Sequence, residues 1–225
     1  GDFISRIYYQ NQLKAGILNQ AELKKHNLEL PWAKDKVAVF CDVKKNFGLE
    51  KSGKSKSRNA EANRIVKILD ELKADSNFED LSIGIITFYA KQVDEIFKEA
   101  ASKGYTEQKT DGGYEIKLQY RETSDGREKL RIGSVDSFQG KEFDIVILST
   151  VRSNTINRNH DNFRKVFGFL TLENRLNVAF SRAQKLLIVV GDGEMFSDEI
   201  AKTYVEGLYE FYTNLSLDTQ YGNRI

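Results

Sequence analysis

Short runs of apolar and β-branched residues alternate with helical patterns along this sequence. The strand-like runs are apolar at nearly every position, which is typical of strands covered on both faces. A repeated order of strand and helix predicts an α/β fold, with a mainly parallel sheet and helices on both sides. The expected strands cover residues 37–43, 83–87, 130–135, 144–151 and 186–190, and the expected helices cover 60–72, 91–101, 172–183 and 199–212.

Two segments interrupt this order. Residues 44–58 are rich in Lys, Ser and Gly and poor in apolar side chains, so we expect a solvated, mobile loop. In residues 113–135, apolar and polar positions alternate around Asp125-Gly126, which indicates a β-hairpin. Because no clear linker divides the chain, we expect one domain over residues 1–225 with this hairpin as an insertion.

The composition limits the classes of function. Thirty-four basic and 33 acidic side chains leave a net charge of +1, so a nucleic-acid site would have to be a local patch. A single cysteine, Cys41, excludes an internal disulfide and is typical of a reducing compartment. We therefore expect the protein in the cytoplasm, or in the nucleus of a eukaryote. No apolar run approaches the length of a membrane span, so we expect no membrane partner.

The sequence GLEKSGKS, residues 48–55, matches the phosphate-loop pattern G-x-x-x-x-G-K-[ST] and would make the chain a self-contained phosphotransferase using Lys54 and Ser55. A true phosphate loop joins a strand directly to a helix, so that backbone N–H groups converge on the phosphates. Here residues 44–47 separate the expected strand from the first glycine, Gly48. Residues 56–58 separate the Gly-Lys-Ser sequence from the helical pattern, where Asn59 is the expected N-cap. Asp192 is the only acid available at a strand end for Mg²⁺. We interpret the match as a chance one in a surface loop.

A more specific block is SVDSFQGKEFDIVILSTVRSN, residues 134–154. Asp136 and Gln139 have the spacing of a capping box that would open a short helix. Gly140 permits close approach of the backbone to a ligand, and Glu142 offers a carboxylate beside that gap. Taken alone, the Q-G-K-E stretch would be an ordinary turn.

A second block is RLNVAFSRAQKLLIVVGD, residues 175–192. Arg175 and Arg182 lie seven residues apart on one expected helix, so they share a face and could present guanidinium groups to a phosphate. A single arginine on a helix is usually solvated. The order and spacing of the two blocks together carry the functional signal.

These two blocks closely resemble motifs V and VI of superfamily one helicases, in the branch that includes senataxin and the nonsense-mediated-decay RNA helicases. Upstream, IGIITFYAKQ (83–92) resembles motif IV, and SRNAEANRIVKIL (57–69) resembles the N-x-x-E-A helix of the family. The opening FISRIYYQNQLKAG (3–16) resembles the segment that follows motif III. The resemblance covers nearly the whole chain.

The resemblance implies a RecA-like three-layer sandwich that serves as the second, C-terminal half of a motor. In this family two RecA-like domains clamp ATP with Mg²⁺, and the first carries the phosphate loop, the Mg²⁺-binding acids and the motif III glutamine. That first domain would lie upstream in the same polypeptide, so we expect no metal ligands on this chain and no ATPase activity from it alone. The implied activity is 5′-to-3′ translocation on single-stranded DNA or RNA. A non-enzymatic binding module with a RecA-like shape is a further alternative.

Roles at the ATP cleft follow from the matching motifs. Arg182 matches the motif VI arginine that reaches the γ-phosphate, and Arg175 would support it. Glu142 matches the motif V acid that bonds the ribose hydroxyl, and Gln139 and Gly140 would line the same edge.

The resemblance also indicates a strand-binding face. Ser134 matches a hydroxyl that touches the nucleic-acid backbone. Thr87 and Tyr89 of motif IV, with Arg152 and Asn154 after motif V, are further candidates. A polar track that touches phosphates suits sequence-independent motion along one strand.

Motif IV departs from the family pattern at two positions. Phe88 stands where proline is common, and Val93 follows Gln92 where some members carry a second arginine. A second phosphate-contacting arginine would then come from elsewhere, with Arg175 as the candidate.

Overall fold

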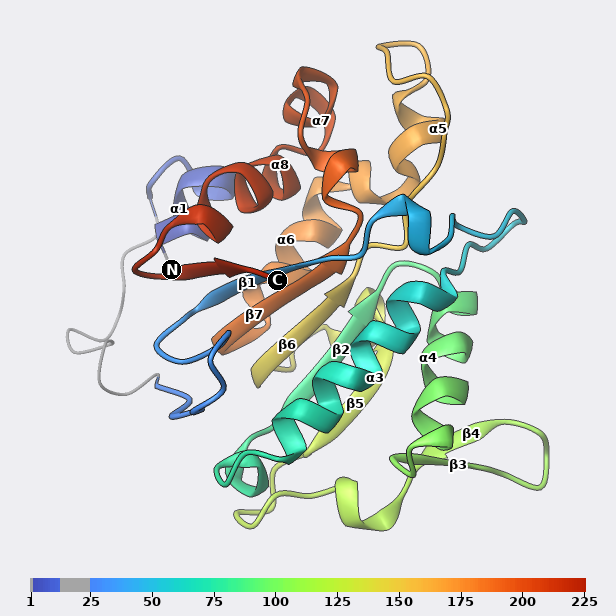
Figure 1. The fold of residues 1–225 in the computed structure, drawn as a ribbon, viewed down its shortest axis with the longest axis vertical. Helices are drawn as coiled ribbons and strands as arrows, with labels where there is room; N and C mark the ends of the chain where they lie inside the picture. The colour runs from blue at the N-terminus through green and yellow to red at the C-terminus, as the bar shows by residue number, and fades with distance from the viewer. Residues whose placement is uncertain (1, 13–24) are drawn as a thin grey trace.

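The computed structural model describes residues 2–12 and 25–225, and it contains one six-stranded sheet between two helical layers (Figure 1). The strand order is β5-β2-β6-β7-β1-β8, and each strand is parallel to its neighbours. This confirms the predicted α/β sandwich. The strands are β1 (Ala38–Asp42), β2 (Ile83–Thr87), β5 (Leu130–Ser134), β6 (Phe143–Ser149), β7 (Ala183–Gly191) and β8 (Gly222–Arg224).

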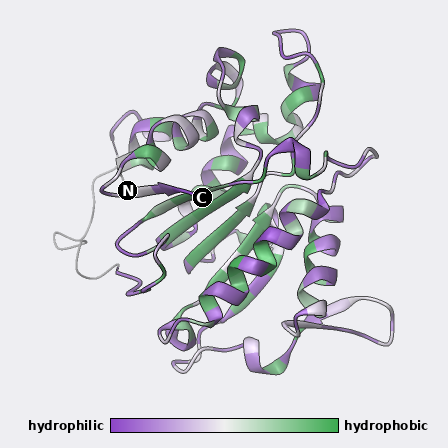
Figure 2. Cartoon of the chain, viewed as in Figure 1, coloured by the Kyte–Doolittle hydropathy of each residue, from purple (hydrophilic) through white to green (hydrophobic). Residues whose placement is uncertain are grey.

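Both faces of the sheet are covered, so its strands are apolar on both sides (Figure 2). Helices α3 and α4 pack on one face, in front of the sheet in Figure 1, and α6 lies behind it. Each face of the sheet thus has its own hydrophobic core. The core on the α6 face also contains residues of α5, α7 and α8, and α1 packs at its border. The helices are α1 (Asp2–Tyr9), α3 (Asn59–Lys73), α4 (Ala90–Ser102), α5 (Phe163–Phe167), α6 (Glu173–Ser181), α7 (Glu199–Tyr204) and α8 (Glu206–Thr213).

The predicted hairpin is wrong in its position. The antiparallel pair consists of β3 (Thr106–Gln108) and β4 (Tyr114–Ile116), whereas the Asp125-Gly126 turn closes a single bridge between Glu122 and Glu128. β5 belongs to the main sheet, parallel to β2. Its apolar residues are buried there, which stabilises the strand more than a hairpin with one solvated face would.

Two helix predictions also need correction. The helix expected over 199–212 is divided into α7 and α8 at Val205, whose φ and ψ are −142° and 48°. Next to this break, Gly207 passes so close to Tyr8 that a Cβ would lie 2.2 Å from the phenol oxygen. The helix expected over 172–183 ends at Ser181, because Ala183 already pairs in β7. The N-terminal block that resembles the segment after motif III contributes α1, and its residues 13–16 lie outside the described part.

Candidate functional site

The sheet brings the two specific sequence blocks together at the edge where β6 and β7 begin. Glu142 immediately precedes β6, and Arg182 immediately precedes β7. These strands are neighbours, with Phe143 in register with Ala183, and the Phe143 N–H donates to the Arg182 carbonyl at 2.9 Å. Two residues that are 40 positions apart in sequence therefore leave the same edge of the sheet side by side.

Arg182 occupies the C-cap of α6, where its guanidinium bonds neutral groups. Nε donates to the Val178 carbonyl at 3.2 Å, Nη2 to Ser181 Oγ at 2.9 Å, and Nη1 to the Lys141 carbonyl at 3.2 Å. In the described part of the chain, no carboxylate forms an ion pair with Arg182. A half-buried guanidinium whose charge is not neutralised is suited to bind an external anion.

The turn before β6 exposes the other candidates of this edge. Gln139, Gly140 and Glu142 are all exposed, and Glu142 accepts a hydrogen bond from Gln184 Nε2 at 2.7 Å. Gly140 has φ +75°, a left-handed conformation that favours glycine. The space around it is open, since a Cβ there would meet no atom within 4 Å. This rim can accept a polar ligand without rearrangement of the core.

Arg175 has a different partner from Arg182. Its Nη2 forms an ion pair with Asp136 Oδ2 at 3.0 Å. The capping box predicted for Asp136 and Gln139 is wrong, because residues 135–138 form a short 3-10 turn whose N-cap is Ser134 and which has no side-chain cap. The Asp136 carboxylate is thus free to hold Arg175. Arg175, within α6, and Arg182, at its C-cap, therefore bond different partners.

Hydroxyl-bearing residues line up at the opposite, carboxyl edge of the sheet. Thr87 ends β2, Ser134 ends β5 and Ser149 ends β6, and the three are in register. Ser134 is half-buried, whereas Thr87 is fully buried and its hydroxyl has no hydrogen-bond partner. Among the candidates from motif IV and β5, only Ser134 is therefore open to solvent.

The remaining candidates for the face that binds nucleic acid form a hydrogen-bonded network beneath the surface. Arg152 and Tyr89 are each only 3% exposed. Arg152 Nη1 donates to Tyr89 Oη at 3.4 Å, its Nη2 donates to the Lys165 carbonyl, and its Nε lies 2.9 Å from Glu50 Oε2. Half-buried Asn154 donates to the same Glu50 oxygen at 3.1 Å. The structure thus brings Arg152, Tyr89 and Asn154 together, but it places only Asn154 near solvent.

Two buried glutamates near this edge were not given a role by the sequence. Glu50 accepts the Ser153 N–H at 2.9 Å, besides its contacts with Arg152 and Asn154. Glu61 is fully buried and forms an ion pair with the equally buried Arg58 at 3.2 Å. Burial raises the pKa of Glu61, and Arg58 opposes that effect. The N-x-x-E-A block was the only sequence signal for Glu61, and no signal distinguished Glu50.

The GLEKSGKS segment does not form a phosphate loop. Lys51 and Ser57 make an antiparallel bridge, and α3 begins only at Asn59, with Arg58 and not Asn59 as its N-cap. Ser55 Oγ accepts the N–H of Lys91 in the first turn of α4 at 3.1 Å, so it is already used. The loop was expected to be solvated throughout, but the Arg58 guanidinium lies buried beneath it. Lys56, Ser57 and Arg58 therefore separate the Gly-Lys-Ser sequence from the first turn of α3.

Asp192, the acid considered for Mg²⁺, is buried and accepts Ser153 Oγ at 2.6 Å. Burial raises its pKa. Within the described residues, no three His, Cys, Asp or Glu side chains come together as a metal site. No helix in that part is long and apolar enough to cross a membrane.

Comparisons with known proteins agree with the sequence motifs. Residues 1–194 match the AAA domain family. The regulator of nonsense transcripts 1 homolog of Drosophila melanogaster is 32% identical over 214 residues, which is 92% of this chain and 15% of that protein. The ATP-dependent helicase upf1 of Schizosaccharomyces pombe is 29% identical over 205 residues, or 87% of this chain and 18% of that protein. The chain thus spans less than a fifth of these curated relatives.

Among solved structures, the C-terminal domain of a possible DNA helicase from Lactobacillus plantarum WCFS1 aligns with a TM-score of 0.44 and 14% identity, over 92% of this chain and 91% of that one. The family match and the curated relatives carry the assignment. The chain belongs to the AAA domain family.

Proposed function

We propose that this domain forms one wall of the ATP cleft of an ATP-dependent helicase that moves 5′-to-3′ along single-stranded DNA or RNA. The opposite wall would come from a first RecA-like domain of the same polypeptide, which would supply the phosphate loop and the acids that bind Mg²⁺. The observation that carries the proposal is the unneutralised guanidinium of Arg182 beside the exposed carboxylate of Glu142. One group suits a phosphate and the other a ribose hydroxyl.

Hydrolysis of ATP builds negative charge on the phosphoryl group that is transferred. A cation held in place beforehand stabilises that charge more in the transition state than in the ground state. The α6 C-cap holds Arg182 in this way through three bonds to neutral groups. Glu142 would fix the ribose, with Gln139 and Gly140 at the same rim, and Arg175 would add a second phosphate contact after leaving Asp136.

At the carboxyl edge of the sheet, we propose that Ser134 and Asn154 contact the backbone of the strand. Both are half-buried and open to solvent on one side. Thr87, Tyr89 and Arg152 would shape this face from below, because each is buried. Contacts through hydroxyl, amide and backbone groups fix position without reading sequence, as a translocating motor needs.

We further propose that residues 1–225 act as one domain in which the β3–β4 pair and the following turn are an insertion. Its free cysteine, Cys41, is buried and fits a protein that works in the cytoplasm or nucleus.

The test is strand-stimulated ATP turnover, measured on the isolated chain and on the polypeptide that also carries a first RecA-like domain. We expect turnover only from the joined polypeptide, because positioning and charge neutralisation of the phosphates need both walls. Turnover by the isolated chain that disappears in Lys54→Ala would establish the phosphotransferase instead. Failure of the joined polypeptide to hydrolyse ATP would favour a binding module.

A further inference from the structure

The loop of residues 44–57 concentrates positive charge in a chain that is nearly neutral overall. It holds five lysines against one glutamate, whereas the whole chain has a net charge of +1. The glutamate, Glu50, is only 6% exposed and its carboxylate faces inward to Arg152 and Asn154. Lys45 and Lys51 pair with acids of other segments, and Lys56 lies 3.7 Å from Glu50. Within the described residues, Lys44 and Lys54 are the loop lysines without an ion pair.

Phe47 is the most exposed aromatic side chain among the described residues, at 68%. It ends a short 3-10 turn, Lys45–Phe47, that is closed by the Phe47 N–H to the Lys44 carbonyl at 3.0 Å. The following Gly48 has φ +125°, which only glycine adopts readily. The ring makes no aromatic or cation–π contact within the described part of the chain. A defined turn thus presents an unpartnered aromatic face to solvent between lysines.

The loop is tied to the segment that follows β6. The Glu50 N–H donates to the Ser153 carbonyl at 3.0 Å, and the Glu50 carboxylate accepts the Ser153 N–H at 2.9 Å. From inside, Arg58 Nε donates to the Gly48 carbonyl at 2.7 Å. The turn that carries Phe47 is therefore held beside the segment that follows β6, next to the proposed path of the nucleic-acid strand.

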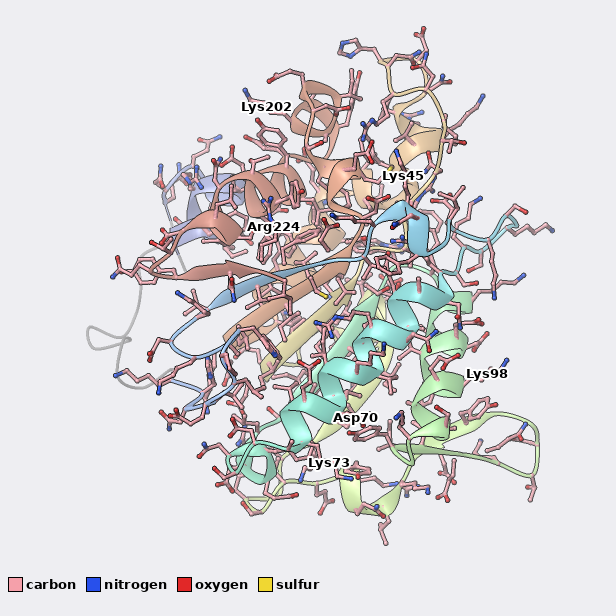
Figure 3. All side chains as sticks on the ribbon, viewed as in Figure 1. Lys45, Asp70, Lys73, Lys98, Lys202 and Arg224 are labelled. Carbon is pink, nitrogen blue, oxygen red and sulfur yellow. The ribbon has the colours of Figure 1, made fainter. Side chains whose placement is uncertain are left out.

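A hollow of about 260 Å³ separates Lys45 from the chain after β6. Lys45 stands where the loop meets this segment (Figure 3). The acids of the hollow are already matched, since Glu194 pairs with Lys45 at 2.9 Å and Asp192 accepts from Ser153. Its polar lining also includes Asn154, Thr155 and Arg158. Arg158 pairs with Asp198 at 2.9 Å and Asn154 donates to Glu50, so a phosphodiester in the hollow would share these donors.

We propose that residues 44–47 form a stacking site for single-stranded nucleic acid, with Phe47 as the platform for one base and Lys44 beside the flanking phosphate. Lys45 would bind a second phosphate by leaving Glu194. The proposal rests on the proposed function and adds a subsite to it. Aromatic rings bind any base through its π-face, and lysines bind the backbone, so the site needs no particular sequence. This gives the glycine- and lysine-rich loop a role that does not require phosphate-loop geometry.

Fluorescence anisotropy on the isolated chain tests the site, with labelled oligothymidylate, oligouridylate and an abasic strand of equal length. We expect Phe47→Ala to weaken binding of strands with bases about tenfold, and Phe47→Trp to restore it. On the abasic strand, wild type and Phe47→Ala should bind alike. Lys44→Gln should lower the slope of log affinity against log salt by about 0.7, the value for one lost phosphate contact on a single strand. Leu118→Ala and Lys98→Gln, at exposed positions outside the loop, are the matched controls.

Equal binding by wild type and Phe47→Ala on strands with bases overturns the stacking site, as does an equal loss on the abasic strand. Absence of any strand binding by the wild-type chain at low salt overturns it too. The motor assignment is judged separately, by ATP turnover of the joined wild-type polypeptide. If the joined wild-type polypeptide hydrolyses ATP but the Phe47 and Lys44 variants bind strands normally, the stacking site is refuted and the motor assignment is not.

Discussion

The carboxylate of Glu61 accepts the backbone N–H of Val151 at 2.8 Å, across 90 positions of sequence. Val151 has φ +68°, a left-handed conformation that is an outlier for a β-branched residue. The same carboxylate oxygen accepts the Ser149 hydroxyl at 2.7 Å, so both ends of the strained bend are tied to α3. This bend turns the chain out of β6 and toward Arg152, and its strain of about 1–3 kcal/mol is balanced by these contacts.

Glu61→Ala should lower the free energy of unfolding by about 3–5 kcal/mol, because it leaves the Arg58 charge buried without a partner. Arg58→Met combined with Glu61→Leu should recover part of that loss, since neither charge remains. Glu199→Ala removes an exposed acid and should change stability by less than about 1 kcal/mol. Urea unfolding followed by circular dichroism measures all of these. A loss for Glu61→Ala as small as that of Glu199→Ala would contradict the buried pair.

Arg182→Ala should reduce kcat of the joined polypeptide by about 10³–10⁵, the range of arginine fingers, because the transferred phosphoryl group loses a fixed cation. Lysine should rescue poorly, since it lacks the planar fork of donors. Steady-state turnover, melting temperature and strand affinity are measured on the same preparations. Near-normal turnover, or loss that follows unfolding, would make Arg182 a structural residue.

Glu142→Ala should raise KM for ATP about tenfold or more, the effect of losing one hydrogen bond to a charged group. The nucleotide itself supplies the control. With 2′,3′-dideoxy-ATP, which has no ribose hydroxyl to bond, the variant and the wild type should have the same KM. If the KM ratio is the same for both nucleotides, Glu142 does not recognise the ribose.

Stability should fall as pH decreases from about 7 to 5, and His26 should cause part of the slope. His26 Nε2 donates to the Lys36 carbonyl at 2.7 Å and Nδ1 accepts the Leu28 N–H at 3.1 Å, so the buried ring is neutral. Burial lowers its pKa. The unfolded state, with a pKa of about 6.5, therefore binds the proton first, and the contribution of His26 is complete above that pH and lost below it.

The measurement is the free energy of unfolding against pH for two variants. His26→Gln should flatten the slope between about pH 7 and 5, because the titrating ring is gone. His160→Gln, at the chain's other and exposed histidine, should keep the wild-type slope. Identical slopes for wild type and His26→Gln would show that His26 does not contribute.

Strands were predicted correctly where a run of apolar residues in the sequence is also buried in the structure. One example is β2, which lies at the expected residues 83–87. The sequence did not predict β8, because the polar residues of this strand are extended only through pairing with β1. The candidate site likewise has a part that the sequence predicted and a part that it did not. The resemblance to motifs V and VI assigned Glu142 and Arg182 to the same cleft, and the pairing of β6 with β7 brings the two residues together. The burial of Arg152 depends on Glu50, about a hundred positions away, and no local pattern contains that information.

The strand order also determines when each strand can pair while the chain is being synthesised. Both neighbours of β1 come late, since Val39 pairs with Ile188 in β7 and with Asn223 in β8. At roughly 5–20 residues per second, a ribosome makes the intervening residues in about 7–30 s, and until then β1 has no strand to pair with. β2, β5 and β6 can assemble earlier on their own side. When β7 emerges and joins the two parts, the same step that completes the core also sets Arg182 beside Glu142.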